Sequence, residues 1–176
     1  MMGIEAVKSS TPAPCRQMIK DVLKLIMTQT EDEVIDFIED CRKKFKSLPP
    51  EEIAFPRTCT NVEKYKATST IYAKGTPIHA RGALLFNHYI KKNKLSQKYS
   101  YINNGEKIKF CYLKKPNTLQ ENVISFIQDF PKELGLDKYV DYELQFEKSF
   151  LEPLKIILDS VGWSAEKTTN LDSFFV

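Results

Sequence analysis

The stretch KGTPIHARGALLFNHYIKK, residues 74–92, decides how the middle of this chain is expected to fold. Gly75 permits a turn, Thr76 can cap a helix, and Pro77 suits the first helical position, because its missing N–H would lack a partner there anyway. We therefore predict a helix from this proline to about Lys92. Three side chains are expected to face inward from it: Ile78, Leu85 and Tyr89.

The apolar pattern changes beyond Lys94. Residues 106–113, EKIKFCYL, alternate polar and apolar side chains at the period of a strand and follow the turn signal Asn104–Gly105. Residues 122–127, NVISFI, are the candidate partner strand. We therefore expect a small β-rich lobe over about residues 98–130.

Two amphipathic helices are expected on the N-terminal side of this lobe. The first covers about residues 14–28, and the second opens at Thr30 and Glu33, which match the T-x-x-E capping box. Pro49 and Pro50 end the second helix, since proline cannot continue it. Both helices carry apolar side chains at helical spacing: Met18, Val22, Leu25 and Ile26 in the first, and Val34, Phe37, Ile38, Cys41 and Phe45 in the second.

Two further helical segments complete the predicted order of elements. A short polar helix is expected near residues 61–67, after a strand or loop. A long helix is expected over residues 139–160, interrupted or kinked at Pro153, and Gly162 marks its end. The predicted fold class is therefore α+β and mostly α-helical, with one small β-rich lobe.

The composition describes one ordinary folded domain. Apolar residues make up 42% and charged residues 28% of the 176 positions. No run approaches the roughly 18 apolar residues of a membrane span. The first ten residues lack the basic and apolar regions of a secretory signal. We therefore expect a cytoplasmic protein.

The sequence offers no recognisable metal centre. The cysteines lie far apart without a C-x-x-C pair, and His79 and His88 are the two histidines of the chain. These residues cannot supply a zinc site at the usual spacings. Free thiols in a reducing compartment are the expected state of the four cysteines, Cys15, Cys41, Cys59 and Cys111.

Positive charge is concentrated in the middle of the chain. The net charge is only +3, but residues 42–115 hold 17 lysines and arginines against 4 acidic residues, whereas the flanks hold 9 against 19. A basic block between acidic flanks favours a polyanion-binding patch, because each neutralised phosphate releases counterions. The alternative is a solvated surface on which the charges intermix in three dimensions.

Catalytic motifs are absent from the sequence. The KGT at residues 74–76 lacks the upstream glycine of a phosphate-binding P-loop, and there is no G-x-S-x-G motif. Acidic residues occur singly on the predicted helices, where a solvated surface is far commoner than a catalytic pair. We therefore interpret the chain as a binding module rather than a self-contained enzyme.

Both ends of the chain carry apolar residues that the predicted helices do not account for. Residues 4–7 have the pattern of a short strand without a local partner, which favours docking onto a larger sheet. The C-terminal sequence TTNLDSFFV places Leu171 and Phe174 at i and i+3, so both can enter one pocket with Phe175 beside them. The alternative is that this end folds back on its own domain.

Four segments of the chain, taken together, resemble a known polymerase domain. In order they are MGIEAVKSSTP (residues 2–12), KGTPIHARGALLFNHYI (residues 74–90), YELQFEKSFLEPL (residues 142–154) and the Phe-rich C-terminus. They are similar to the thumb of family B DNA polymerases, in particular those of T-even-type bacteriophages, and the likeness covers essentially the whole chain. The resemblance implies a palm-edge strand (residues 1–10), a thumb domain (residues 11–163) and a clamp-binding tail (residues 164–176).

The resemblance also implies what the chain does not contain. The catalytic aspartates of these polymerases lie upstream in the full enzyme. This chain is therefore expected to be the small piece of a split DNA-directed DNA polymerase, or an excised domain, and to be inactive as a nucleotidyltransferase on its own. No cofactor is expected in it. Mg²⁺ is expected in the palm domain of a larger partner fragment, which also carries the exonuclease and the fingers.

By the same resemblance, the thumb grips primer–template double-stranded DNA and the tail binds the sliding clamp, which supports processive replication. His79 can instead be a structural histidine, and Lys148 can instead pair with neighbouring glutamates. The matching DNA-binding positions are Lys64, Tyr65, Lys74, His79, Arg81 and Lys148, and the matching clamp-binding positions are Leu171, Phe174 and Phe175.

A different class of function is also open at this point. A free-standing nucleic-acid-binding or clamp-adaptor protein, without a polymerase partner, would carry the same basic block and the same apolar C-terminus. The two functions differ in whether the chain needs a larger fragment. If the chain is phage-encoded, the expected location is the cytoplasm of the host cell.

Overall fold

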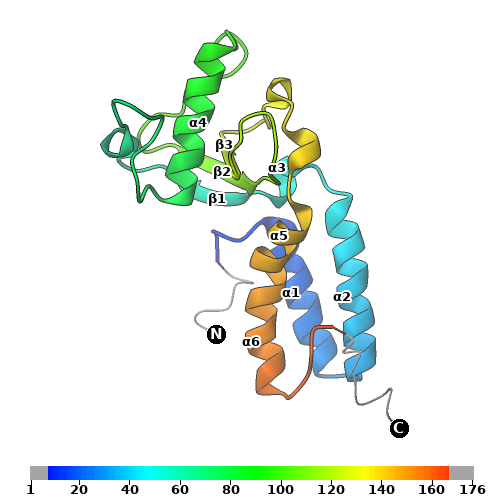
Figure 1. Cartoon of the computed structure of the whole chain (residues 1–176). Coiled ribbons are helices and arrows are strands. Elements are labelled where there is room, and N and C mark those ends of the chain that lie inside the picture. Colours follow the sequence, from blue (N-terminus) through cyan, green and yellow to red (C-terminus); the bar gives the residue numbers. More distant parts are fainter. Residues whose placement is uncertain (1–7, 167–176) are drawn as a thin grey trace. The chain divides into compact units, whose positions relative to one another are not determined.

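The computed structural model describes residues 8–166, which divide into two compact units. Residues 8–48 and 146–166 form the helical unit, and residues 49–145 form the sheet unit (Figure 1). Helices combined with one small antiparallel sheet confirm the predicted α+β class. Within residues 8–166, every helix is too short or too polar to cross a bilayer.

Three helices build most of the helical unit: α1 (Ala13–Ile26), α2 (Glu31–Lys46) and α6 (Glu152–Ser160). The predicted capping box is present at the start of α2. The N–H of Glu33 donates to Thr30 Oγ1 at 3.3 Å, and the N–H of Thr30 donates to Glu33 Oε2 at 3.0 Å. The box thus pairs two amides that would otherwise lack partners.

Aromatic side chains form the centre of the helical unit. The ring of Phe146 stands edge-on to Phe45 with centroids 5.2 Å apart, and its centroid lies 4.8 Å from that of Phe150. The guanidinium of Arg42 lies 5.0 Å from the Phe146 centroid, a cation–π contact. All three rings are buried, and buried aromatic rings contribute strongly to small cores.

The long helix predicted over residues 139–160 is divided into three parts. α5 covers only Tyr142–Phe146, a π-helical turn covers Glu147–Leu151, and α6 follows. The interruption therefore lies before Pro153 rather than at it. Pro153 follows the π-helical turn, in a backbone that stays helical through Leu151 and Glu152, and because it lacks an N–H it cannot donate to a carbonyl of the turn before it.

The sheet unit contains a three-stranded antiparallel sheet in the order β1 (Phe55–Thr58), β2 (Lys107–Tyr112), β3 (Val123–Phe126). β2 and β3 are the two predicted strands. β1 comes from outside the lobe predicted over residues 98–130, so the sheet extends beyond that boundary. β1 is a short edge strand that contains Pro56, and proline is tolerated at an edge because no neighbour needs its N–H.

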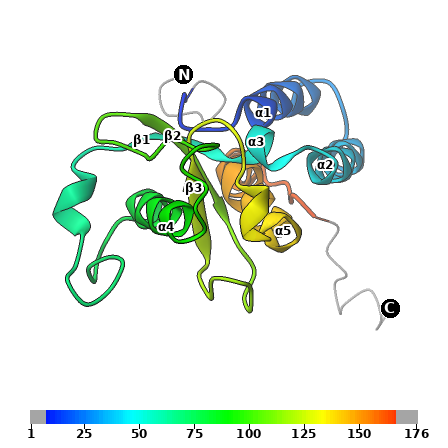
Figure 2. The ribbon, with the colours of Figure 1, turned by 90° about the horizontal axis from the view of Figure 1, so that it is seen from above.

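Helix α4 (Ile78–Lys92) lies against β3 (Figure 2). The two elements approach closely at Gly82: a Cβ there would collide with the Ser125 side chain and lie 2.8 Å from the Ser125 backbone nitrogen. Ser125 Oγ also donates to the carbonyl oxygen of His79 at 2.9 Å. Only glycine leaves room for this contact between helix and strand.

The start of α4 differs from the prediction in detail. Pro77 is the N-cap residue, so the helix begins one residue later than expected. Thr76 does not cap it; its hydroxyl donates to the carbonyl oxygen of Ala73 at 2.6 Å and closes the preceding turn. Leu85 is buried as predicted, whereas the other two side chains expected to face inward, Ile78 and Tyr89, are half-buried.

Short helical turns complete the described elements: α3 (Pro50–Ile53), η2 (Val62–Tyr65), η3 (Lys132–Leu134) and η4 (Asp137–Tyr139). η2 is the predicted short polar helix, shortened to one 3₁₀ turn. The four cysteines are free and buried. Burial raises the pKa of the Cys15 and Cys59 thiols to about 11, so both are protonated near neutral pH and weakly reactive.

Candidate nucleic-acid interface

Five of the six predicted DNA-binding residues lie in one stretch of the sheet unit, from η2 to the first turn of α4. We call residues 62–81 the η2–α4 segment. The sixth residue, Lys148, lies half-buried in the π-helical turn of the helical unit. The predicted set is therefore divided between the two units, and the η2–α4 segment is the candidate interface.

Lys64 stands on the η2 turn with its charge exposed. Its Nζ lies 5.6 Å from the centroid of the Tyr65 ring, a cation–π contact. This contact leaves the positive charge of Lys64 in place. Val62 anchors the same turn because its side chain is only 2% exposed. The carbonyl oxygen of Tyr65 accepts a hydrogen bond from the N–H of Ala73 at 2.7 Å. This bond closes the base of the loop between them.

Lys74 occupies the turn that leads into α4. Its side chain is exposed, and Gly75 after it has φ +83°, a conformation that favours glycine. The hydroxyl of Thr76 closes this turn, as described above. Lys74 is thus an exposed side chain on a hydrogen-bonded turn, which suits contact with a phosphate at no particular base.

Arg81 takes part in a cluster within the sheet unit. Its Nη2 donates to Asn122 Oδ1 at 2.7 Å, and its guanidinium lies 5.6 Å from the Tyr72 ring centroid. The Tyr72 hydroxyl lies 3.0 Å from both carboxylate oxygens of Glu121. Burial and the hydrogen bond to Glu121 raise the pKa of Tyr72. Arg81 therefore connects the η2–α4 segment to the connection between β2 and β3.

His79 lies half-buried in the first turn of α4. Burial and the nearby charge of Arg57 lower its pKa below the usual value of histidine. A histidine with a lowered pKa is neutral at pH 7 and offers a phosphate a hydrogen bond rather than a charge. A neutral, half-buried histidine is compatible with both roles considered for this residue, a DNA contact and a structural side chain.

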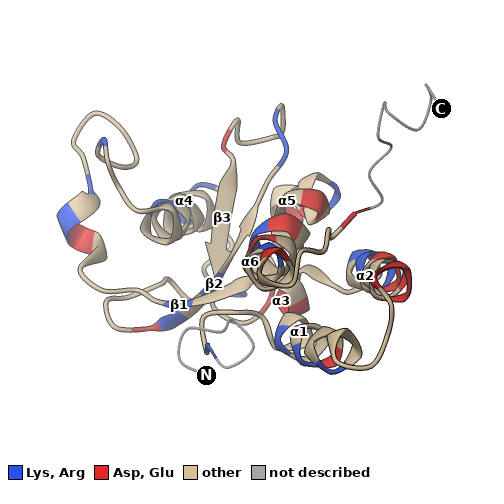
Figure 3. Cartoon of the chain, turned by 90° about the horizontal axis from the view of Figure 1, so that it is seen from below, with Lys and Arg blue, Asp and Glu red and all other residues tan. Residues whose placement is uncertain are grey.

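The basic block of the sequence is divided between the two units. Four of its cations lie on α2 of the helical unit: Arg42, Lys43, Lys44 and Lys46. The sheet unit, residues 49–145, holds 15 lysines and arginines against 10 acidic residues, which leaves a net charge of +5. Figure 3 shows both signs of charge on α2, whereas α4 carries basic residues and no acidic one. The positive surplus therefore belongs to the sheet unit.

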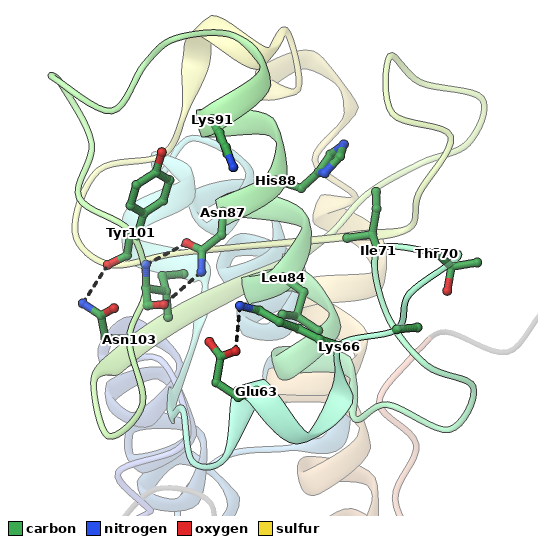
Figure 4. A pocket seen from close by; sticks show the side chains of 12 residues that line it. Glu63, Lys66, Thr70, Ile71, Leu84, Asn87, His88, Lys91, Tyr101 and Asn103 are labelled. Carbon is green, nitrogen blue, oxygen red and sulfur yellow. Dashed lines mark hydrogen bonds and ion pairs between the residues drawn. The ribbon is translucent and has the colours of Figure 1, made fainter.

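An open pocket of about 460 Å³ lies beside the η2–α4 segment (Figure 4). Its size falls in the range of small-ligand sites, roughly 300–1,000 Å³. Leu84 and Ile102 are its buried apolar members, and lysines, a histidine and a tyrosine surround them. Three parts of the chain line it: Glu63, Lys66, Ala67, Thr70 and Ile71 from η2 and the following loop, Leu84, Asn87, His88 and Lys91 from α4, and Tyr101, Ile102 and Asn103.

Asn87 holds one wall of this pocket in place. Its Nδ2 donates to the carbonyl oxygen of Ile102 at 2.9 Å, and its Oδ1 accepts from the N–H of Ile102 at 2.7 Å. On the opposite side, Lys66 Nζ pairs with Glu63 Oε2 at 2.7 Å (Figure 4). These two hydrogen bonds fix the orientation of the Asn87 amide against the backbone of Ile102.

Sequence reasoning missed the residues of this pocket. A usable signal was present on α4, because Leu84, Asn87, His88 and Lys91 follow the i, i+3, i+4, i+7 spacing of one helix face. The wall at residues 101–103 gave no such signal, since only the fold brings it to α4. Within residues 8–166, no three His, Cys, Asp or Glu side chains converge as metal ligands would.

The two ends of the chain lie outside the described residues. This applies to the strand predicted at residues 4–7 and to the predicted clamp-binding residues Leu171, Phe174 and Phe175. The last described residues are held on the helical unit. The N–H of Ser164 donates to Glu31 Oε1 at 2.9 Å, and Glu166 Oε1 lies 3.3 Å from Arg42 Nη2. The predicted tail, residues 164–176, is thus fixed over its first three residues.

Two phage proteins match nearly the whole chain. The DNA-directed DNA polymerase of Enterobacteria phage T4 is 26% identical over 179 residues, which cover 99% of this chain and 19% of the phage protein. The DNA-directed DNA polymerase of Escherichia phage RB69 is 27% identical over 180 residues, with the same coverage. No family model matches the chain. The predicted resemblance to T4-like phage DNA polymerases is confirmed, and the chain spans 19% of the length of these relatives.

Proposed function

We propose that this chain is the thumb part of a replicative DNA polymerase of the T4-like phage kind and that its sheet unit grips primer–template duplex. Similarity to two phage DNA-directed DNA polymerases over 99% of the chain supports the polymerase assignment. The observation that carries the DNA contact is the η2–α4 segment. It presents two exposed lysines, Lys64 and Lys74, which flank the hydrogen bond between Tyr65 and Ala73 at the base of a loop.

The chemistry of this segment fits the phosphate backbone rather than the bases. Lysine is a compact cation with three rotatable donors, so it can follow a phosphate without demanding one geometry. Tyr65 beside Lys64 adds an apolar surface that can lie against a sugar. Arg81 acts mainly within the chain in this proposal, because Asn122 and Tyr72 already hold its guanidinium. The resulting grip is independent of base sequence.

The proposal leaves polymerisation to another chain. The chain spans 19% of the two phage polymerases, so the catalytic carboxylates and their Mg²⁺ are assigned to a larger fragment. In this arrangement the present chain supplies duplex binding and the C-terminal residues Leu171, Phe174 and Phe175 attach to the sliding clamp. Simultaneous attachment to DNA and clamp would strengthen both, since the second contact becomes intramolecular.

The DNA contact is tested by fluorescence anisotropy with a labelled primer–template duplex over a range of salt concentrations. Lys64→Ala and Lys74→Ala should each weaken binding and lower the salt slope by about one, the value for one lost phosphate contact. Lys138→Ala is the matched control. Lys138 is exposed in the same unit, and its Nζ lies 5.4 Å from the Tyr139 ring centroid, like Lys64 over Tyr65.

The loss of duplex affinity in Lys64→Ala and Lys74→Ala should be the same on two duplexes of unrelated sequence. An unchanged salt slope in both variants, or an equal loss in Lys138→Ala, would show that the η2–α4 segment is not the interface. If the loss of duplex affinity depended on base sequence, the segment would recognise bases rather than the phosphate backbone.

The polymerase assignment needs a separate test. The chain alone should show no nucleotide incorporation, and its addition to the larger fragment of the polymerase should restore processive primer extension. If the chain binds DNA but leaves extension by the fragment unchanged, the free-standing nucleic-acid-binding function replaces the thumb. Removal of residues 171–176 should leave duplex affinity intact and abolish the stimulation by the clamp.

A further inference from the structure

We propose that the pocket beside the η2–α4 segment binds one unpaired nucleotide of a single DNA strand, with the base against Tyr101 and the phosphate near Lys91 and Lys66. The inference rests on the proposed nucleic-acid binding and extends it from duplex to an unpaired strand. The site would therefore hold the part of a primer–template that has left the double helix. No such role follows from the grip assigned to Lys64 and Lys74.

The shape of the pocket favours a single planar group rather than a duplex. It is a concave space of about 460 Å³ between α4, the loop after η2 and residues 101–103. Leu84 and Ile102 are only 3% exposed, so they give it an apolar floor. A double helix would contact the exposed Lys64 and Lys74 instead, because its bases are stacked inside the helix and cannot enter such a space.

Tyr101 provides a surface for stacking. Four large hydrophobic side chains are exposed within residues 8–166, and Tyr101, at 38%, is the one that belongs to the sheet unit. In Figure 4 its ring stands at one side of the pocket, on the chain segment that Asn87 fixes to α4. Base–aromatic stacking is the usual way in which proteins bind unpaired strands without reading their sequence.

The charges around the pocket suit a phosphate. Lys91 extends from α4 toward the pocket in Figure 4, and His88 and Lys66 are further basic members of the lining. The lining contains one acidic residue, Glu63, and this residue is paired with Lys66. A phosphate can therefore approach Lys91 without meeting an uncompensated carboxylate.

The polar groups of the pocket do not favour a particular base. Asn87, whose amide could read a base edge, is held by two hydrogen bonds to the backbone of Ile102, so only its second N–H and second lone pair remain for a ligand. Recognition then depends on the ring of Tyr101 and on charge. We expect similar affinity for different unpaired bases.

The test compares two labelled probes in fluorescence anisotropy with the full chain: an oligothymidylate and a blunt hairpin duplex of equal charge. Tyr101→Ala should weaken oligothymidylate binding about 5- to 10-fold, the lower part of the range for base–aromatic stacking, and leave hairpin binding unchanged. Tyr101→Phe should retain wild-type affinity because it keeps the ring. Lys91→Ala should reduce oligothymidylate affinity more than Lys138→Ala, which removes an equal charge outside the pocket.

Three results would overturn the inference. They are a failure of the wild-type chain to bind oligothymidylate, an unchanged affinity in Tyr101→Ala, and an equal loss on both probes. A different result would reject the proposed duplex grip: the Lys64→Ala and Lys74→Ala variants would bind the hairpin with the affinity of the wild-type chain. Wild-type binding of oligothymidylate without hairpin binding would reject the grip and leave the pocket assignment standing.

Discussion

The helical unit and the sheet unit use their charged side chains in different ways. In the helical unit, Arg42 lies 3.6 Å from Glu39, 3.3 Å from Glu166 and above the Phe146 ring. Its neighbouring lysines stand in the last turn of α2, where unpaired carbonyls attract cations. In the sheet unit, Lys64 and Lys74 are exposed at the base of a loop that a backbone hydrogen bond closes. Cations of one basic block in the sequence can thus be paired within a helix in one unit and exposed to solvent in the other.

The largest expected effect concerns the core of the helical unit. Phe146→Ala should lower the free energy of unfolding of that unit by about 3–5 kcal/mol, since it removes a buried ring and leaves a cavity. The single tryptophan, Trp163, belongs to this unit, so its fluorescence during urea unfolding measures the change. Duplex affinity of the folded variant should match the wild-type value. A loss of duplex affinity in the folded variant would mean that the helical unit also contacts DNA.

A smaller effect is expected in the sheet unit. Gly82→Ala should destabilise that unit by about 1–3 kcal/mol, because the added methyl group meets the side chain and backbone of Ser125. Circular dichroism should detect the change, while the midpoint of the Trp163 fluorescence transition should not move. Combining it with Ser125→Ala should recover only part of the loss, since the backbone clash remains. Coincident shifts of both signals would show that the two units unfold as one.

The capping box offers a gentler perturbation of the helical unit. Thr30→Ala should cost about 1 kcal/mol, because the N–H of Glu33 loses its partner. Thr30→Ser keeps the hydroxyl and is the control. Urea unfolding followed by Trp163 fluorescence measures both. A Thr30→Ala variant as stable as the wild-type chain would show that solvent replaces the cap without cost.

The smallest effect is a pH dependence of the sheet unit. Hydrogen bonds from Lys98 and Tyr99 hold the pKa of Glu133 down to about 2. A carboxyl with a folded pKa below its unfolded value of about 4.3 stabilises the fold at higher pH. That contribution is lost as the pH falls from about 4.3 toward 2. The group is partly exposed, so the loss should stay below about 1 kcal/mol. Between about pH 4.3 and 2, the free energy of unfolding should change less with pH in Glu133→Gln than in the wild-type chain. An equal slope in the two proteins would show that Glu133 does not contribute in this way.

Local signals in the sequence predicted much of the fold. The capping box at Thr30 and Glu33, the turn at Gly75 and the alternation of β2 each depend on neighbouring residues, and each is present. β1 was missed as a member of the sheet because four residues with Pro56 among them carry no alternation. Its partners become visible only through the register with β2.

The candidate site was less predictable than the fold. Exposure of Lys64 and Lys74 agrees with the prediction that they face a ligand, but the roles of the basic residues depend on contacts that sequence spacing does not reveal. Arg81 meets Asn122 across 41 positions, and Asn87 meets Ile102 across 15. Such pairings arise from the packing of α4 on the sheet. Burial and the charge of Arg57 likewise decide the state of His79.

Asn87 has a mechanical consequence. Its amide donates one hydrogen bond to the Ile102 backbone and accepts one from it, as a residue of a neighbouring strand would, so residues 101–103 are joined to α4 without a further strand. Any slide or rotation of α4 must carry this wall with it. The seat of α4 on the sheet is set in turn by the contact between Gly82 and Ser125. The buried contact between Gly82 and Ser125 therefore also influences the width of the pocket. A methyl group added at Gly82 would change the pocket opening although Gly82 is not one of the residues that line it.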